Sequence, residues 1–300
     1  MEQEVQTTIE QTDPVSEPII TNQTTPAMTA FKELFSQAWN IYKKTFKTSI
    51  KVLLAGLLIA GISFGVGVVT FTAALGMATL VTGWVGIASV IIFGVVACLV
   101  FAISIYLMVI ALIALYQVVM ETVPADTAIR ERFRIARKSV HPMIEVSFIS
   151  VLVVLGGMAL FVIPGIWISL PMSFVGLAVL FDNKTTHQAI EQSISLAKGR
   201  WWSVFFRLFL LQVVFFVVML PIGWIGKMLH VKDLLNNVFS IVTMPLSMIF
   251  TIVLWKDLKR VHAGEIAPMS NFVRALMIIG AVVVGAIIIG LCFFGFAPLR

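Results

Sequence analysis

The sequence predicts an all-α membrane protein: a polytopic bundle of transmembrane helices made of three repeats, each an interfacial amphipathic helix plus a two-span hairpin, with an additional C-terminal span. Three observations predict it. Of 300 residues, 59% are hydrophobic and only 12% are charged, whereas soluble domains carry about 25% charged residues. Long uncharged runs alternate with short basic segments. These basic segments share one pattern that occurs three times.

Residues 1–30 are predicted to form a disordered acidic tail. The segment is rich in Thr, Gln and Pro and has no Lys or Arg, and such composition cannot bury enough apolar surface to fold. It also lacks the basic start and short apolar core of a secretory signal peptide. Its five acidic residues are Glu2, Glu4, Glu10, Asp13 and Glu17.

The first uncharged run extends from Val52 to Met120, over 69 residues. Because a membrane helix needs about 20 residues, the run holds either two long spans or three short ones. A break is expected near Thr79–Gly86, where Gly, Thr and Trp gather. Both flanks are strongly basic, so the number of crossings must be even, and two fits best.

The next apolar run, from Ile144 to Phe181, contains the dipeptide Pro164-Gly165. Proline cannot continue a helix and glycine turns easily, so this dipeptide is predicted to be the hairpin turn between two spans. Three further spans are predicted over Phe205–Pro221, Val238–Trp255, with a kink at Pro245, and Leu276–Phe296.

Small residues spaced four apart predict close helix packing. In the first span these pairs are Gly56/Ala60 and Gly61/Gly65, and in the last span they are Ala281/Gly285 and Ala286/Gly290.

The basic residues are distributed very unequally between the two ends of the predicted spans. Short loops rich in Lys and Arg stay in the cytoplasm, so the side with more basic residues is predicted to be cytoplasmic. The protein is then a multi-pass plasma-membrane protein with its N-terminus in the cytoplasm and its C-terminus outside. Eighteen of the 21 Lys and Arg residues lie on this predicted cytoplasmic side, and the others are Lys227, Lys232 and Arg300.

The repeat is visible in the segments IYKKTFKTSI, IARKSVHPMI and LAKGRWWSVF, each of which carries basic residues just before a span. Upstream of each span, apolar residues at three-and-four spacing predict a helix lying along the membrane surface. Asp126 is expected to cap the second such helix, and Thr185 with Gln188 to form a capping box on the third. The predicted divisions are a tail 1–30, a six-span domain 31–262 with repeats 31–123, 124–184 and 185–262, and a C-terminal span 263–300.

Basic and aromatic residues at the helix entrances are predicted to anchor the protein at the membrane boundary. Tryptophan prefers the headgroup layer, and Lys and Arg extend their charged ends to water and to lipid phosphate. The predicted anchors or anionic-lipid contacts are Lys43, Lys44, Arg137, Lys138, Lys198, Arg200, Trp201, Trp202 and Arg207.

The stretch PGIWISLPMSFVGLAVLFDN, followed by AIEQSISLAKGRWWSVFFRLFLL, resembles the membrane domain attached to glycerophosphoryl diester phosphodiesterases and the related YciC-like bacterial membrane proteins. The N-terminal LFSQAWNIYKKTFKTSI is similar to the opening segment of that family. The resemblance extends over residues 31–262 and is most specific at 163–207. It implies a prokaryotic polytopic membrane protein and no reaction, because in fused members a separate soluble domain performs the catalysis.

No set of residues in the sequence indicates chemistry, so we expect no catalytic activity, no metal and no cofactor. The four histidines are scattered without a metal-ligand spacing. Glu145, one residue inside the third span, is the single candidate for an intramembrane polar site.

Two functions remain open. The first is a non-catalytic scaffold or lipid-associating module whose basic cytoplasmic belt contacts membrane lipids, including anionic headgroups, and no nucleic acid. The alternative is a transporter or permease for an apolar or lipid-like substrate, in which Pro164, Pro171 and Pro245 would break the spans that line its pathway.

Overall fold

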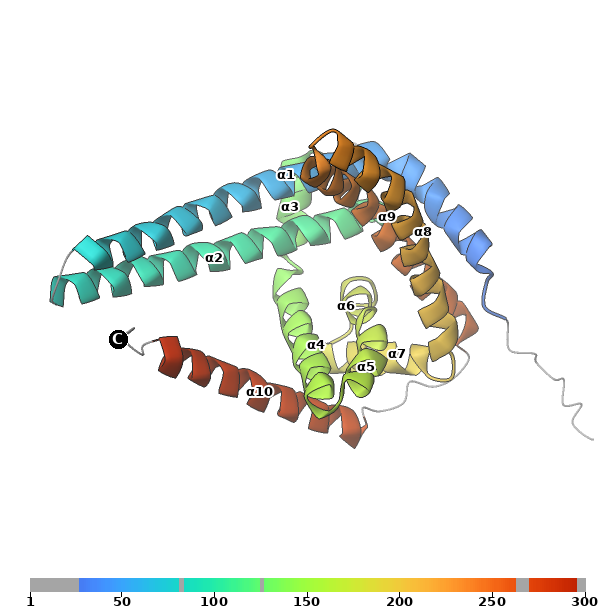
Figure 1. Cartoon of the computed structure of the whole chain (residues 1–300). Helices are drawn as coiled ribbons and strands as arrows, with labels where there is room; N and C mark the ends of the chain where they lie inside the picture. Colours follow the sequence, from blue (N-terminus) through green and yellow to red (C-terminus); the bar gives the residue numbers. More distant parts are fainter. Residues whose placement is uncertain (1–26, 81–83, 125–126, 263–269, 296–300) are drawn as a thin grey trace, which may run out of the picture.

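The computed structural model describes residues 27–80, 84–124, 127–262 and 270–295, and these residues form ten α-helices and no strand (Figure 1). The all-α prediction is therefore confirmed. The helices are α1 (Phe31–Leu80), α2 (Trp84–Val119), α3 (Ile129–Arg137), α4 (Val140–Leu160), α5 (Val162–Met172), α6 (Val175–Asp182), α7 (Thr186–Ala197), α8 (Trp201–Met228), α9 (Lys232–Val261) and α10 (Asn271–Gly295).

Six described segments are long and apolar enough to cross a bilayer. They match the six spans predicted before residue 262, and such a set is typical of a multi-pass membrane protein. The segments are Phe31–Ala73, Ile91–Val119, Val140–Leu160, Val162–Asp182, Trp201–Met228 and Lys232–Val261.

The first uncharged run forms two helices, α1 and α2, and the break between them falls where it was predicted, between Leu80 and Trp84. The expected separate surface helix before the first span is wrong, because α1 continues without interruption from Phe31 into the span. From Phe31 to Ala55 the sequence has no Gly or Pro, so nothing there interrupts the helical hydrogen bonds.

The predicted hairpin turn at Pro164 and Gly165 is also wrong in position. The chain turns at Phe161, which has extended backbone angles between α4 and α5. Pro164 lies in the first turn of α5, where a missing N–H costs nothing because first-turn donors have no partner within the helix. Gly165 lies inside α5 against Gly157 and Met158 of α4, and a Cβ there would stand 2.4 Å from the Met158 Cγ. The absence of a side chain at Gly165 therefore allows α4 and α5 to pack closely.

The fourth apolar segment is broken into α5 and α6 at Ser173 and Phe174. The helix that follows, α7, starts with the predicted capping box: the backbone N–H of Thr185 donates to the Gln188 side chain at 3.3 Å. Most of α7 is buried, including Ala189 and Ile190. It packs against α5 and α6, whereas the sequence predicted that it would lie along the membrane surface. The cap predicted at Asp126 lies outside the described residues.

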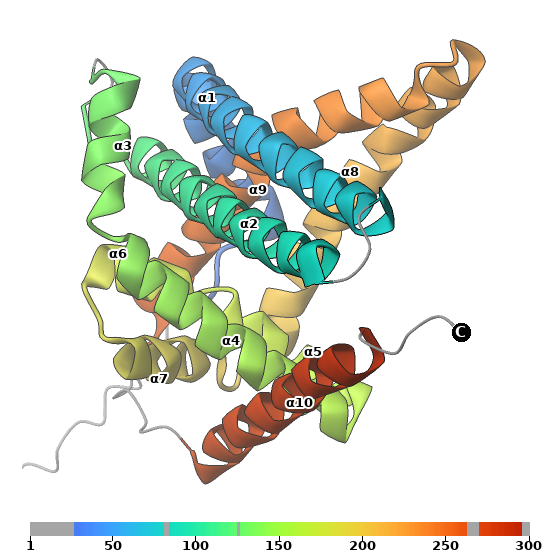
Figure 2. The ribbon, with the colours of Figure 1, turned by 90° about the vertical axis from the view of Figure 1, so that its left-hand side faces the viewer.

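The apolar helices do not all run in one direction. Figure 1 shows the α1–α2 hairpin extending away from the rest of the protein, and Figure 2 shows the α8–α9 hairpin leaving at a wide angle to it. The two hairpins meet where α9 packs against the first half of α1. From there the second half of α1 and the first half of α2 project with their apolar side chains uncovered, including Leu58, Val69 and Leu99.

The last helix, α10, lies across α4 at two glycines. A Cβ on Gly280 would stand 1.8 Å from the Leu152 carbonyl oxygen, and one on Gly156 would stand 1.9 Å from the Leu276 carbonyl oxygen. The sequence placed the close contact of this span at Ala281/Gly285, but nothing lies within 4 Å of a Cβ at Gly285. In α1 the expected contact at Gly56 is confirmed, because a Cβ there would stand 2.2 Å from the Cβ of Ala111, but the one expected at Gly61 and Gly65 is wrong, because nothing lies within 4 Å of a Cβ at either glycine.

Two apolar cores hold the described helices together. One joins α2 to α4–α7 and α10 around Ile113, Val153 and Ile190. The other joins the start of α1 to α8 and α9 around Leu34 and Phe250. Both cores include residues close to the basic ends of the helices, such as Leu34 and Val140, so these ends are packed within the protein.

Candidate functional site

The two predicted tryptophan anchors belong to a cluster of three tryptophans. The Trp201 ring stacks on Trp167 of α5 with ring centroids 4.3 Å apart and an interplanar angle of 2°. Trp202 meets both of these rings edge-on. Trp202 is 58% exposed, so its indole is available to a headgroup layer, whereas Trp201 is half-buried.

Pro171 explains how Trp201 is held. Proline has no N–H, so the carbonyl four residues earlier, that of Trp167, lacks its usual helical donor. The indole Nε1 of Trp201 donates to that carbonyl at 2.9 Å. Sequence reasoning missed Trp167 as a member of this cluster, although the pair Trp167 and Pro171 at four-residue spacing was the available signal.

The basic residues just before the tryptophans have different surroundings. Gly199 has φ +74°, a left-handed conformation that glycine adopts readily, and it turns the chain between α7 and α8. Lys198 is exposed, as an anchor should be. Arg200 is half-buried and donates to the Val261 carbonyl at 3.3 Å, which ties the start of α8 to the end of α9.

Arg207 makes hydrogen bonds within the protein. Its Nε and terminal nitrogen both donate to the Thr29 carbonyl, at 3.1 and 2.7 Å. Thr29 in turn donates to the buried carboxylate of Asp257 from its backbone N–H and its hydroxyl, at 3.0 and 2.6 Å. Arg260 also bonds Asp257, at 2.7 Å. This cluster secures the start of α1 to α8 and α9, so Arg207 has a structural role, and its contact with lipid stays a prediction.

The anchors predicted on α1 and α3 are exposed: Lys43, Lys44, Arg137 and Lys138. Lys44 pairs with Glu121, just beyond α2, at 2.7 Å. Arg137 donates to the Tyr106 hydroxyl of α2 at 3.1 Å. Helix α3 therefore runs back along α2 from its end toward Tyr106.

A groove separates α3 from the α1–α2 hairpin, and its volume is about 720 Å³. Its α3 wall carries Arg130, Arg134 and Arg137, and its other wall is apolar. Arg134 pairs with Glu131 at 2.6 Å. This hydrogen bond lowers the pKa of the Glu131 carboxyl, with the charges of Arg134 and Lys138 adding to the effect. Of five cavities compared among the described residues, only this groove is lined by three arginines together with an apolar wall.

Glu145, the candidate intramembrane polar site, is exposed on the first turns of α4. The Thr186 hydroxyl of α7 donates to its carboxylate at 2.8 Å. The carboxylate thus lies beside the N-terminal end of α7, where the helix dipole favours a negative charge. Its observed role is to join α4 to α7.

Sequence reasoning also missed Asp182 as a junction. Its carboxylate accepts from Lys259 of α9 at 2.8 and 2.9 Å and from the Gln192 amide of α7 at 2.7 Å. The Lys259 ammonium additionally lies 4.6 Å from the centre of the Trp255 ring. An acidic residue at the end of an apolar run was the signal that could have found it.

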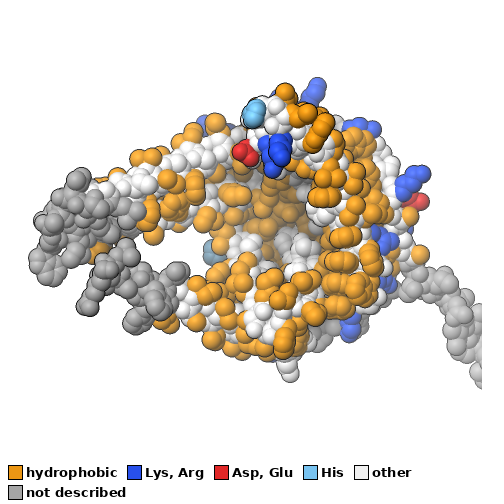
Figure 3. All heavy atoms as spheres, viewed as in Figure 1, with side chains coloured by type: hydrophobic (Ala, Val, Ile, Leu, Met, Phe, Trp, Pro, Cys, Tyr) orange, Lys and Arg blue, Asp and Glu red, His pale blue; other side chains and the backbone are white. Residues whose placement is uncertain are grey.

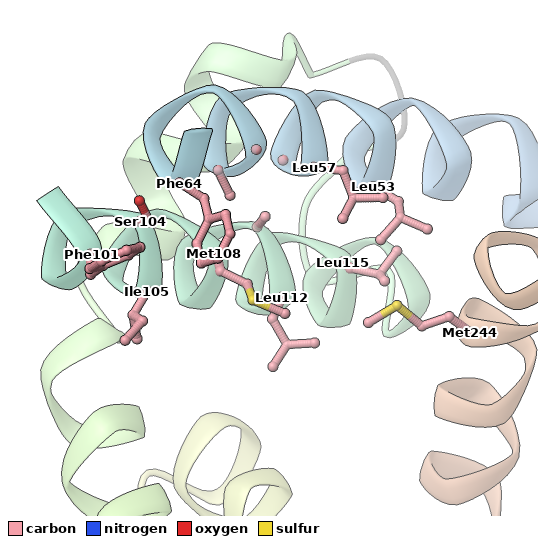
Figure 4. Close-up of a pocket in the computed structure, with 14 residues that line it drawn as sticks. Leu53, Leu57, Phe64, Phe101, Ser104, Ile105, Met108, Leu112, Leu115 and Met244 are labelled. Carbon is pink, nitrogen blue, oxygen red and sulfur yellow. The ribbon is translucent and has the colours of Figure 1, made fainter. Parts of the chain in front are cut away.

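A second cavity, about 540 Å³ in volume, lies along the α1–α2 hairpin. Figure 4 shows Met244 of α9 at one end of this cavity and Phe64 and Phe101 at the other. Ser104 is the polar side chain in its wall, and its hydroxyl already donates to the Val100 carbonyl at 2.9 Å. The cavity therefore suits an apolar occupant.

The surface as a whole agrees with an apolar environment. On the face in Figure 3, hydrophobic side chains cover most of the described surface, and Lys and Arg side chains lie along the upper and right-hand rim. A hollow separates the α1–α2 hairpin from the part formed by α4, α5 and α10. Among the described residues, no group of three or more His, Cys, Asp and Glu could hold a metal ion.

No family model matches this chain, and neither does any curated protein or any solved structure.

Proposed function

We propose that the chain is a non-catalytic integral membrane protein that acts as a scaffold or lipid-associating module of the plasma membrane. Its tail and basic helix ends lie in the cytoplasm, its C-terminus lies outside, and residues 31–262 are three repeats that each contain a two-span hairpin. The observation that carries the proposal is that Lys198 and Trp202, four residues apart at the start of an apolar helix, are both exposed. Such pairs are typical of helix ends at a headgroup layer.

Contacts between helix ends support the assignment of these ends to one side. If the basic ends share a compartment, the polar residues around them should be able to reach one another. Four pairs of such ends are joined by Lys44 and Glu121, Asp182 and Lys259, Arg200 and Val261, and Glu145 and Thr186.

Labelling of single cysteines tests the topology. In a variant with Cys98 and Cys292 replaced by Ser, cysteines at Lys43, Lys138 and Lys198 should resist a membrane-impermeant maleimide added to intact cells. Cysteines at Lys227 and Lys232 should react. If Lys138 and Lys198 fall in opposite compartments, the topology and the repeat are both wrong.

Lipid analysis tests the function. The purified protein should retain anionic lipid in preference to phosphatidylcholine when it is taken from nanodiscs that contain both. The triple variant K43Q/K138Q/K198Q should lose this preference, because exposed basic residues near an anionic surface contribute about 1 kcal/mol each. The control K227Q/K232Q removes two exposed charges from the other helix ends and should retain it. Equal lipid composition in all three proteins would refute a lipid-associating role.

The apolar cavity beside α1 and α2 favours one second function, a transporter or permease for an apolar or lipid-like substrate. Its walls would accept an acyl chain without unpaired polar groups. Proteoliposomes separate the two functions. A transporter should accelerate the loss of a fluorescent phospholipid from the inner leaflet to an external quencher, and a scaffold should leave the rate at that of protein-free liposomes.

A further inference from the structure

The groove between α3 and the α1–α2 hairpin combines two kinds of wall. On one side, Arg130, Arg134 and Arg137 follow one another at spacings of four and three residues, which places them on the same face of α3. On the other side are Ile59 of α1 and Leu107 and Ile110 of α2. The charged and the apolar walls face the same cavity of about 720 Å³.

The charges in this groove favour an anion. Three guanidinium groups line it and are opposed by one carboxylate, that of Glu131, which is occupied by Arg134. Arg137 uses one donor on Tyr106, and a guanidinium has five N–H donors in all. A planar guanidinium matches the geometry of a phosphate group and binds it through paired hydrogen bonds.

Helix α3 is held firmly in place beside the groove. The Arg132 side chain is 1% exposed, and it donates to the carbonyls of Pro124 and Thr127 in the connection from α2. Arg132 thus fixes the start of α3, and Arg137 fixes its end against Tyr106. The helix that carries the arginines is therefore fixed in position, which lowers the entropy cost of binding.

The apolar wall decides between two sources of phosphate. Free inorganic phosphate would satisfy the arginines and leave Ile59, which is 39% exposed, uncovered. A phospholipid would supply the same anion together with an acyl chain that covers the wall. The uncovered apolar surface continues from Ile59 to Ile62 along α1, so a chain that enters the groove has an apolar path to follow.

We propose that this groove binds one anionic phospholipid, with its phosphate on Arg130 and Arg134 and one acyl chain against Ile59, Leu107 and Ile110. The proposal rests on the proposed function, because it requires that the chain lies in a bilayer. It adds a defined site with one lipid per protein, which a general basic belt does not provide.

Native mass spectrometry of the protein from nanodiscs of phosphatidylcholine and phosphatidylglycerol tests the site. The wild type should retain one phosphatidylglycerol. In R130Q/R134Q the retention should weaken at least about tenfold, since hydrogen bonds to charged groups contribute about 1.5–3 kcal/mol each. The matched control K227Q/K232Q, which removes the same charge at the opposite helix ends, should retain the lipid as the wild type does.

A second variant separates the source of the phosphate and guards against a folding defect. Ile59→Trp fills the apolar wall and leaves every arginine in place, so it should abolish retention of the lipid while helicity measured by circular dichroism stays unchanged. If Ile59→Trp retains the lipid, and inorganic phosphate competes at the arginines, the site binds free phosphate and the proposal is wrong.

The remaining outcomes distinguish this site from the proposed function. If R130Q/R134Q retains the lipid, or if the control loses it equally, the site is wrong while the general preference for anionic lipid stands. If the wild type itself retains no anionic lipid above its share in the nanodisc, the proposed function fails together with the site.

Discussion

Trp201 is bound to Trp167 in two independent ways: the two indole rings stack with centroids 4.3 Å apart, and the Trp201 Nε1 donates to the Trp167 carbonyl at 2.9 Å. The hydrogen bond uses a carbonyl that Pro171 leaves without a helical donor. The two contacts join α5 to α8. Substitutions can remove the two contacts separately, because the hydrogen bond is accepted by a backbone carbonyl whereas the stacking is between two side-chain rings.

Trp201→Phe removes the hydrogen bond and keeps a ring for stacking, so it should lower the free energy of unfolding by about 1–3 kcal/mol, the cost of an unpaired polar group. Trp167→Ala removes the stacking and keeps the carbonyl. Unfolding in mixed detergent micelles, followed by circular dichroism, measures both. Trp224→Phe, at a 65% exposed tryptophan near the end of α8, should change stability by less than about 0.5 kcal/mol. Equal effects at Trp201 and Trp224 would contradict the role of the bond.

The Lys259–Asp182 and Lys44–Glu121 ion pairs should contribute differently to stability because their carboxylates differ in exposure. The Asp182 side chain is 16% exposed and the Glu121 side chain is 54% exposed. Asp182→Asn should therefore cost about 1–3 kcal/mol, since it leaves Lys259 without its carboxylate. Glu121→Gln should cost less than about 1 kcal/mol, as exposed pairs usually do. The same unfolding measurement decides, and a larger loss for Glu121→Gln would show that Asp182 does not join α6, α7 and α9.

The α4–α10 crossing should depend on Gly280 and not on Gly285. Leucine at Gly280 would drive its side chain into the backbone of α4, whereas leucine at Gly285 has open space. Gly280→Leu should therefore separate α10 from α4, and Gly285→Leu should not. Spin labels at the exposed positions Phe148 and Ile278 report this separation as a longer and broader distance distribution. An unchanged distribution in Gly280→Leu would mean that α10 does not cross α4 at this glycine.

The Glu131–Arg134 pair on α3 should make stability depend on pH in the acid range. The hydrogen bond from Arg134 lowers the pKa of Glu131, so the folded state holds the ionised carboxylate more strongly than the unfolded state does. The contribution is complete above the ordinary carboxyl pKa of about 4.3 and is lost as the pH falls through the lowered value. Glu131→Gln should remove this dependence. Parallel pH profiles of wild type and variant, taken by thermal unfolding, would contradict it.

The sequence predicted most of the elements and fewer of their contacts. Long uncharged runs determine where apolar helices occur, and the residues around Leu80 and Trp84 marked the first hairpin correctly. Proline was harder to interpret. Pro164 in the first turn of α5 and Pro171 inside it have the same chemical effect, and only the position of Phe161 shows which of them lies near the turn.

The site was predicted less completely because the same residue type serves two purposes. Lys198 lies three residues before the start of α8 and Arg207 six residues after it, yet Arg207 bonds Thr29 and Lys198 is exposed. Thr29 lies 178 residues away in the sequence, and no local pattern predicts such a contact. The groove beside α3 was likewise hidden, since its apolar wall comes from α1 and α2.

Helix α1 contains 50 residues in one uninterrupted run, and at 1.5 Å per residue it measures about 75 Å. The hydrocarbon layer of a bilayer is about 30 Å thick, so more than half of this rod would lie outside that layer when it crosses once. A thinner or thicker bilayer changes the tilt of a long helix. Because α1 is uninterrupted between Phe31 and Leu80, any tilt of the half that lies in the bilayer would also move the half that carries the lysines.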